Sequence, residues 1–287
     1  MSIAILIGVH DGIVLAADSA STLTLLPSGN LPDQQSPVPL MVYNNANKIA
    51  NLLKGEPVGC VAYGSGSIGN ASISTLLKDF RLKISAGQEP GFSFDGYSMQ
   101  VVAELLTQFL VAHIDQLPPN APKPSLGILV GGYSKGRSLG EGWMVQIENG
   151  SARTPQLLRK EHEVGITWGG EAEAISRLVV GFGQPLPAIL SSVVAAQQPD
   201  TVARLMEMVK VNLQAPIVFS PMPIQDAIDL AEFLVHTAIM YSRFTPGLQT
   251  VGGPIEIAAI TKHEGFKWIQ RKHYYNSEFN RGDANEN

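Results

Sequence analysis

The sequence predicts an α+β fold in which two sheets pack face to face between helical layers, a four-layer αββα sandwich. Three observations support this prediction. Apolar, β-prone segments occur in pairs at the start, in the middle and at the end of the chain. Segments with helical apolar spacing stand in blocks between these pairs. A parallel, doubly wound sheet would instead alternate strands and helices more evenly.

The first strand pair is a predicted hairpin. Residues 3–9 and 13–17 are almost wholly apolar, and the dipeptide Asp11-Gly12 between them is a strong turn signal. Folding at this turn brings the start of the chain beside the end of the second strand. We therefore expect Ser2 and Asp18 to share one end of a sheet.

The remaining elements follow from the same apolar patterns. Residues 26–40, rich in Pro, Gly, Asn and Gln, are predicted to form an inserted surface loop. Further strands are predicted within 41–53 and over 57–63, 125–133, 141–148, 164–170, 254–261 and 266–270. Helices are predicted over 70–85, 97–117, 171–181, 186–212 with a break at Pro199, and 224–241. Residues 1–273 are expected to form one domain, and the polar residues 274–287 a disordered tail.

Composition restricts the possible functions. The chain has 287 residues, of which 45% are hydrophobic, enough for a large core. A net charge of −5 offers no basic field for nucleic acid. The single cysteine excludes an internal disulfide, and without a Cys/His cluster of zinc spacing we expect no metal and no cofactor. No apolar run has membrane-spanning length and no secretory signal is recognisable, so we expect a cytoplasmic protein without a membrane partner.

Asp18 stands out because it is an acid at the end of an otherwise apolar strand. Its carboxylate could accept hydrogen bonds from Ser19, Ser21 or backbone N–H groups of the turn that follows. Alternatively, it could balance a positive charge at a functional site. The residues alone leave both interpretations open.

Three segments resemble the proteasome β-subunit family of N-terminal nucleophile (Ntn) hydrolases and its bacterial proteasome-like relatives. They are GIVLAADSAST from Gly12, NKIANL around Lys48 and GCVAYGSGS from Gly59. SLGILVGGY, Trp168-Gly169-Gly170 and VGGPIEI from Val251 extend the resemblance over most of the chain. The resemblance implies the αββα fold of that family and a homo-oligomeric ring or open spiral.

The resemblance also implies a mechanism. In that family the first residue of the mature chain is the nucleophile, and its own α-amine, or a water held by it, handles the proton. An α-amine has an unperturbed pKa of about 7.7–8.0, so a substantial fraction is neutral near pH 7. By resemblance, Ser2 is the nucleophile after removal of Met1, Asp18 is the buried acid and Lys48 lies beside the nucleophile. The spacing from Ser2 to Gly12 and Asp18 equals that of the family.

Other site residues follow by the same resemblance. The backbone N–H of Tyr63 or of Gly64 is the expected donor to the oxyanion. Ser21 and Thr22 are expected to bind the substrate backbone by strand addition. The implied activity is hydrolysis of peptide bonds in a peptide or unfolded-protein substrate.

Departures from the family pattern leave two other functions open. Ser2 stands where proteasome β subunits carry Thr, and Ala20 stands where Arg is usual. Leu248 and Val251 occupy the positions of an acid and a serine before the late Gly-Gly pair. Such a chain also fits a non-catalytic structural or assembly subunit. A third possibility is an amidase of the same fold that acts on a small molecule.

Overall fold

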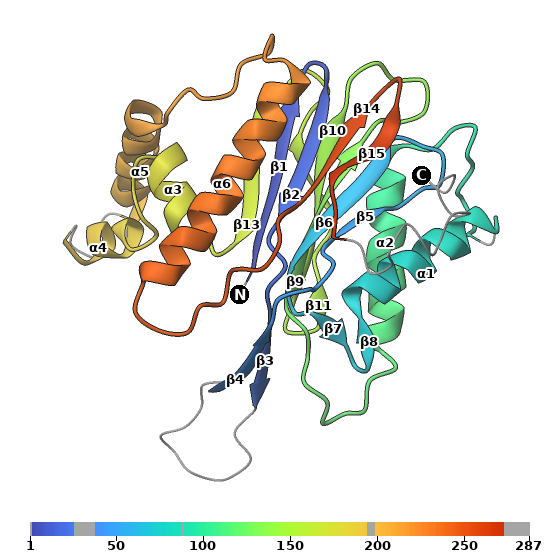
Figure 1. Cartoon of the computed structure of the whole chain (residues 1–287), viewed down its shortest axis with the longest axis horizontal. Coiled ribbons are helices and arrows are strands. Elements are labelled where there is room, and N and C mark those ends of the chain that lie inside the picture. Colours follow the sequence, from blue (N-terminus) through green and yellow to red (C-terminus); the bar gives the residue numbers. More distant parts are fainter. Residues whose placement is uncertain (1, 26–37, 88, 194–198, 273–287) are drawn as a thin grey trace.

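The computed structural model describes residues 2–25, 38–87, 89–193 and 199–272. The fold is mixed α+β, with antiparallel sheets and helices on their outer sides (Figure 1). The strands of the first sheet lie in the order β13 (Gly165–Gly170), β1 (Ile3–Val9), β2 (Gly12–Ala17), β14 (Glu256–Thr261) and β15 (Gly265–Gln270). This sheet therefore joins the beginning of the chain to its last described strands.

The second sheet comes from the middle of the chain. Its strands lie in the order β11 (Ser151–Ala152), β10 (Glu141–Glu148), β9 (Leu126–Gly132), β6 (Val58–Gly64) and β5 (Ile49–Asn51), and β12 (Gln156–Arg159) also pairs with β10. Two short hairpins are separate from both sheets, namely β3 (Ser21–Leu25) with β4 (Val38–Tyr43) and β7 (Ser67–Ile68) with β8 (Ala71–Ser72).

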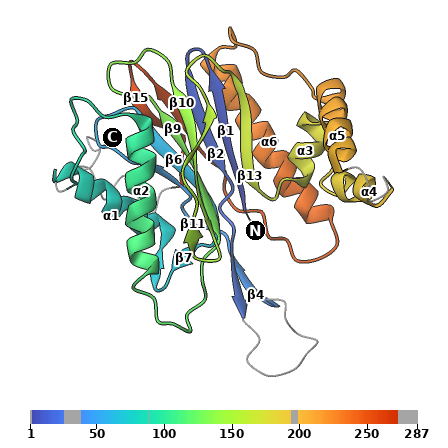
Figure 2. The same cartoon turned by 180° about the vertical axis from the view of Figure 1, so that it is seen from behind.

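Helices cover the outer face of each sheet (Figure 2). They are α1 (Ile73–Ser85), α2 (Met99–Ile114), α3 (Glu173–Val179), α4 (Leu186–Val193), α5 (Pro199–Leu213) and α6 (Ile224–Phe244). Helices α1 and α2 pack on the second sheet, and α3 and α6 pack on the first. Helices α4 and α5 lie farther out on the side of α3 and α6 (Figure 1).

Strand β1 explains why the start of the sequence is apolar throughout. Ile3, Ile5 and Ile7 point toward α3 and α6, whereas Ala4 and Leu6 point toward the second sheet. Because side chains alternate between the two faces of a strand and both faces are covered, every residue of β1 is buried. The first sheet is thus fixed between a helical layer and the second sheet.

Serine caps fix the starts of the helices on the second sheet. The Ser72 hydroxyl accepts a hydrogen bond from Thr75 N–H at 3.1 Å at the start of α1. The Ser98 hydroxyl accepts one from Val101 N–H at 3.3 Å at the start of α2. Each cap satisfies a backbone donor that the first helical turn leaves unpaired.

One predicted loop and one predicted turn are misplaced, and many predicted helices and strands differ by one to three residues at their ends. The loop predicted over 26–40 extends too far, because residues 38–40 belong to β4 and pair with β3. The first hairpin turns at His10 and Asp11, since Val9 pairs with Gly12 and Gly12 already belongs to β2. Residues 26–37 and the tail predicted over 274–287 lie outside the described residues. None of the helices in the described ranges combines the length and apolar character needed to cross a membrane.

Candidate functional site

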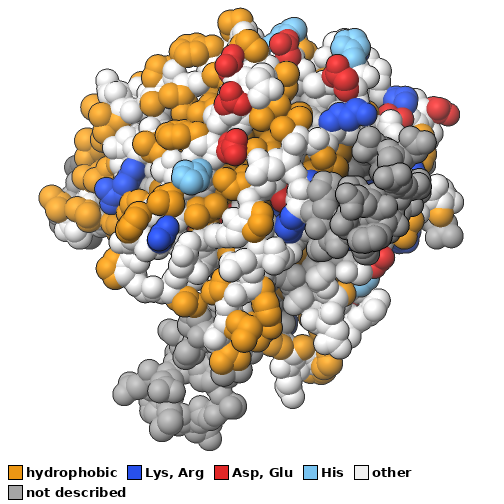
Figure 3. All heavy atoms as spheres, viewed as in Figure 1, with side chains coloured by type: hydrophobic (Ala, Val, Ile, Leu, Met, Phe, Trp, Pro, Cys, Tyr) orange, Lys and Arg blue, Asp and Glu red, His pale blue; other side chains and the backbone are white. Residues whose placement is uncertain are grey.

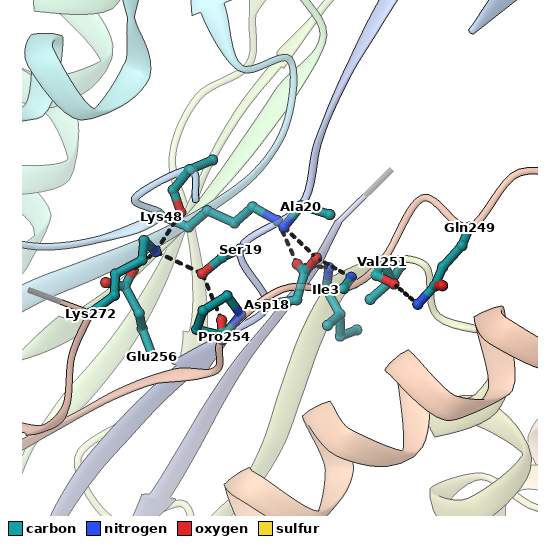
Figure 4. A network of polar contacts seen from close by, with 12 residues as sticks. Ile3, Asp18, Ser19, Ala20, Lys48, Gln249, Val251, Pro254, Glu256 and Lys272 are labelled. Atoms are coloured by element: carbon teal, nitrogen blue, oxygen red, sulfur yellow. Dashed lines mark hydrogen bonds and ion pairs between the residues drawn. The ribbon is translucent and has the colours of Figure 1, made fainter. Parts of the chain in front are cut away.

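Asp18 lies completely buried at the end of β2, with hydrogen bonds to both carboxylate oxygens (Figure 4). Oδ1 accepts from Ile3 N–H at 2.9 Å and from Lys48 Nζ at 2.5 Å. Oδ2 accepts from the N–H groups of Ala20 and Gly252, each at 3.0 Å. Four donors match the capacity of an ionised carboxylate. Asp18 therefore accepts a bond from its own turn, through Ala20, and also faces a cation.

Lys48 precedes β5 and is only 7% exposed. Burial lowers the pKa of its ammonium group from the usual lysine value, while the charge of Asp18 and the hydrogen bond to it act in the opposite direction. Two charges removed from water repay their desolvation only when they are well paired. The pair is thus expensive to bury, and it would be an unusual choice for a purely structural position.

Ser2 lies directly before β1 and is 5% exposed. Its carbonyl oxygen accepts a hydrogen bond from Glu171 N–H at 2.6 Å. Gly170 makes this close approach possible, because it has a φ of 94° and a Cβ there would lie 1.8 Å from the Ser2 carbonyl oxygen. The junction after β13 therefore holds the start of β1 beside the turn of Asp18.

A cavity of about 610 Å³ opens at this end of the sheets. Ser2 and Lys48 line it together with Ser21, Tyr63 and Gly64, and the first turn of α1 forms another wall. Asp18 is not in the cavity wall but behind Lys48. A serine and a buried lysine thus line the same cavity. A positive charge at such a place can stabilise negative charge that develops on an oxygen.

A smaller cavity of about 70 Å³ lies at the opposite end of β1, between His10 and Arg159. It contains neither a serine–lysine pair nor any of the predicted site residues. The described residues also include no group of three or more His, Cys, Asp or Glu side chains that could hold a metal ion. The larger cavity is therefore the better candidate for a functional site.

The direction of the backbone N–H groups distinguishes Gly64 from Tyr63. Ala62 N–H donates to Lys48 O at 2.9 Å, and Ser65 N–H donates to Ser125 O at 2.8 Å on the other side of the strand. Successive N–H groups of a strand point to opposite sides. Hence Gly64 N–H points to the side of Lys48, and Tyr63 N–H points toward β9. This alternation favours Gly64 over Tyr63 as a donor into the cavity.

The side chain of Tyr63 is directed between the sheets. Its hydroxyl lies 3.6 Å from Met144 Sδ, and its ring occupies the space that a Cβ at Gly127 or Gly169 would need. Burial raises the pKa of its hydroxyl. Any contribution of Tyr63 to chemistry in the cavity would therefore come from its backbone.

Ser21 and Thr22 differ in their positions. Ser21 lines the cavity, whereas Thr22 does not. Both pair with β4, through Tyr43 and Val42, so one edge of β3 is occupied. Within the described residues, an added strand could therefore pair only with the edge of β3 that faces away from β4. The Thr22 Oγ1 atom is buried and has no hydrogen-bond partner within the described residues.

Comparison with known proteins finds solved structures of similar fold but no matching family. No family model matches the chain, and no curated protein matches it. The structure of Anbu (ancestral beta-subunit) from Yersinia bercovieri has a TM-score of 0.52 at 12% sequence identity, covering 98% of this chain and 92% of that one. The fold is similar to that of Anbu.

Two further solved structures have a similar fold. Anbu from Hyphomicrobium sp. strain MC1 gives a TM-score of 0.52 at 12% identity and covers 97% of this chain and 91% of its own. A Gly-1 mutant of that Anbu gives 0.53 at 12% identity, with coverages of 98% and 91%. Likeness to Anbu at this identity shows a proteasome-like fold and no more.

This result corrects the family assignment made from the sequence. Membership of the proteasome β-subunit family is not supported, because no family model matches and the likeness to Anbu is one of fold alone. The segments that suggested the family cover strands β2 and β5, most of β6 and the adjoining turns. A shared fold constrains such positions even where the sequences have diverged.

Several contacts around Asp18 were not predicted from the sequence. Gly252 donates to its carboxylate, and Ser19, Glu256 and Lys272 form a second polar group beside it (Figure 4). Glu256 carried a signal similar to that of Asp18, since each is an acid at one end of an apolar strand. Lys272 carried no such signal, because an isolated lysine near a polar tail usually lies in solvent.

Proposed function

We propose that this chain hydrolyses amide bonds with the Ser2 hydroxyl as nucleophile, after removal of Met1. The observation that carries the proposal is the buried Asp18–Lys48 ion pair, because Lys48 lines the same cavity as Ser2. The free α-amine of Ser2 would serve as the base, since its ordinary pKa leaves part of it neutral near pH 7. Lys48 would lower the pKa of that amine through its charge, and Asp18 would hold Lys48 in place.

The reaction needs two steps. In the first, Ser2 Oγ attacks the amide carbonyl carbon, its proton passes to the α-amine and then to the leaving amine, and the C–N bond breaks. In the second, water attacks the resulting ester and releases the carboxylate product, which restores the Ser2 hydroxyl. Gly64 N–H would stabilise the oxyanion in both steps. In this proposal the nucleophile, the base and the oxyanion donor all come from the chain, and only water is added.

Peptides are the substrates that we propose first. The edge of β3 opposite β4 offers backbone groups to an extended chain, and Ser21 lies at the point where this edge reaches the cavity. A cavity of about 610 Å³ also falls in the range that binds small molecules, about 300–1,000 Å³. An amidase that acts on a small molecule is therefore the second candidate.

The architecture supports the same proposal. Apolar clusters lie between α1/α2 and the second sheet, between the two sheets, and between the first sheet and α3/α6. We interpret them as the three interfaces of a four-layer αββα sandwich that forms one domain. The active cavity would then lie at one end of the two central layers.

Assembly into a homo-oligomer, as a ring or open spiral, is part of the proposal. The outer side of α4, α5 and α6 exposes large apolar side chains, and Figure 3 shows hydrophobic residues gathered on this side. They include Val193, Met208, Val211, Phe233 and Phe244. Light scattering on the purified chain should give a mass of several subunits, and Val211→Asp should lower that mass.

The test of the nucleophile has two parts. Intact-mass measurement of the natively produced protein should show loss of Met1, and a retained Met1 would refute the mechanism. A peptide epoxyketone or β-lactone probe should then label wild type and Ser74→Ala, a control serine of the same cavity wall, but not Ser2→Ala. Labelling that survives Ser2→Ala would exclude Ser2. Loss of Met1 without any labelling or peptide cleavage would instead favour a non-catalytic assembly subunit.

A further inference from the structure

A second buried ion pair lies beside Asp18 and Lys48. Lys272 Nζ donates to Ser19 Oγ at 2.6 Å and to Ala46 O at 2.7 Å (Figure 4). It also lies 2.9 Å from Glu256 Oε2, close enough for an ion pair although not aligned as a hydrogen bond. The side chains of Lys272 and Glu256 are 9% and 1% exposed. An ammonium group carries three N–H donors, and three oxygens surround this one.

Two of the three oxygens that Lys272 contacts, Ser19 Oγ and Ala46 O, belong to segments that carry a site residue. Ser19 follows Asp18, and Ala46 lies two residues before Lys48. The Ser19 hydroxyl, in turn, donates to Pro254 O at 2.6 Å, and Ala46 N–H donates to Ser19 O at 2.9 Å. Lys272, which does not itself line the cavity, therefore joins the turn of Asp18 to the loop of Lys48.

Glu256 explains how the cation is held in this position. It is the first residue of β14 and pairs with Ala17, the last residue of β2, so its side chain lies next to the turn of Asp18. Ile257 pairs with Gln270, which brings the chain after β15 back to the same point. The ladder of β2, β14 and β15 thus places a carboxylate and an ammonium group directly behind the candidate site.

We propose that Lys272 is a positioning residue for the candidate site, with Glu256 as its counter-ion: it fixes the separation between the segments of Asp18 and Lys48. The catalytic purpose of this geometry rests on the proposed function, whereas the contacts of Lys272 do not. A lysine that only stabilised the end of β15 would need no contact with Ser19 or Ala46. Its contacts go instead to the two segments whose alignment forms the Asp18–Lys48 pair.

The second pair also acts on Lys48 through its charges. Three charged groups interact with Lys48 within the described residues, namely Asp18 after β2, Glu256 in β14 and Lys272 after β15. Asp18 and Glu256 raise the pKa of Lys48, and Lys272 lowers it. In the intact pair the effects of Glu256 and Lys272 oppose each other. Removing the charge of Glu256 should therefore lower the pKa of Lys48, and removing the charge of Lys272 should raise it.

The experiment measures Lys48 directly by NMR of lysine side chains labelled at Cε, with Lys48→Met to assign the signal. Glu256→Gln leaves the Lys272 charge uncompensated and should lower the Lys48 pKa. Lys272→Met leaves the Glu256 charge uncompensated and should raise it. Lys135→Met is the matched control, because it breaks a Lys–Glu pair, Lys135 with Glu56, at the opposite end of β6. It should leave the Lys48 titration unchanged.

The positioning role is tested by the reactivity of Ser2. If probe labelling occurs in wild type, Lys272→Met should slow it about tenfold to hundredfold, since a displacement of about 1 Å can cost 10²-fold. The double variant Lys272→Met/Glu256→Gln removes both charges, so it should restore the Lys48 titration toward wild type but not the labelling rate. Circular dichroism and thermal unfolding verify that each variant is folded.

The outcomes separate this inference from the proposed function. Opposite shifts of the Lys48 titration with no labelling of any variant would support the pair and refute the hydrolase. Labelling of Ser2 in wild type, with a Lys48 titration and a labelling rate that neither substitution changes, would overturn the inference and leave the hydrolase standing. Shifts in the same direction in both folded single variants would also overturn it. If Lys272→Met does not fold, Glu256→Gln, which keeps the shape of the side chain, decides the question alone.

Discussion

The backbone N–H of Gly252 donates a hydrogen bond to Asp18 Oδ2 at 3.0 Å, although 234 residues separate them in sequence. Ser19 N–H donates in return to Gly252 O at 2.9 Å. Beside it, Val251 is fully buried, and its carbonyl oxygen accepts from Gln249 Nε2 at 3.0 Å. The segment before β14 therefore supports Asp18 through its backbone, so this support does not require an acid or a serine there.

Gly252 and Gly253 should respond differently to substitution by alanine. A Cβ at Gly252 would lie nearest to the flexible end of Gln249, at 3.3 Å, whereas Gly253 has a φ of 76° and its Cβ would lie 2.4 Å from Asn44 O. We expect Gly252→Ala to change the free energy of unfolding by about 0.5 kcal/mol or less, and Gly253→Ala to lower it by about 1–3 kcal/mol. Urea unfolding at pH 7 measures both. Equal losses of unfolding free energy in the two variants would contradict the difference in backbone geometry between Gly252 and Gly253.

Asp18→Asn should destabilise the fold strongly. The substitution keeps the shape of the side chain but leaves Lys48, which is 7% exposed, as a buried charge without its partner. Breaking a buried pair from one side costs about 3–5 kcal/mol. Asp79→Asn, at an exposed position of α1, is the control and should have little effect. Unfolding in urea that gives the same midpoint for both variants would show that the pair contributes no such stabilisation.

The hairpin and the major strands were predictable because their signals are local. Pairing of β1 with β2 follows from two apolar runs around a short turn, and the register then fixes Ser2 next to Asp18. Continuous apolar runs also indicated β6, β9 and β14. In contrast, β7, β8 and β11 have two residues each, too few to show any period.

The contacts around Asp18 show why the complete site could not be predicted. Lys272 reaches Ser19 across 253 residues, and Gly252 contributes only a backbone N–H group, which leaves no signature in a sequence. The choice between Tyr63 and Gly64 likewise depends on strand alternation relative to Ala62, which only the pairing reveals. The family assignment failed for a related reason: short similar segments in buried strands and the turns beside them indicate a shared fold before they indicate membership of one family.

Gly64→Ala should affect both stability and reactivity. Gly64 has a φ of 93°, and its Cβ would lie 2.6 Å from Ser125 O, so the end of β6 would have to move. Gly87, with a φ of 67° and open space around it, is the control for backbone strain alone. If Gly64 N–H stabilises the oxyanion, Gly64→Ala should slow probe labelling of Ser2 by about 10²-fold or more, the usual cost of one lost oxyanion donor. Gly87→Ala should label at the wild-type rate. Equal labelling of all three proteins would exclude this role for Gly64.

Lys48 should give the stability of the protein a recognisable dependence on alkaline pH. Burial lowers its pKa in the native chain below the unfolded value of 10.5. Between the native pKa and 10.5 the unfolded chain binds more protons, so the free energy of unfolding attributable to Lys48 rises with pH across this window. Below the native pKa, Lys48 is charged in both states and adds no slope.

Urea unfolding at a series of pH values measures this slope. Lys48→Met should lose the alkaline rise relative to wild type, whereas Lys78→Met, at an exposed lysine of α1, should keep it. Lys272 also has a native pKa lowered by burial, so part of the rise should persist in Lys48→Met and disappear only when both lysines are replaced. A slope in Lys48→Met that equals the wild-type slope would mean that Lys48 keeps an ordinary pKa despite its burial. Its ammonium charge would then persist throughout the pH range in which the α-amine of Ser2 becomes neutral.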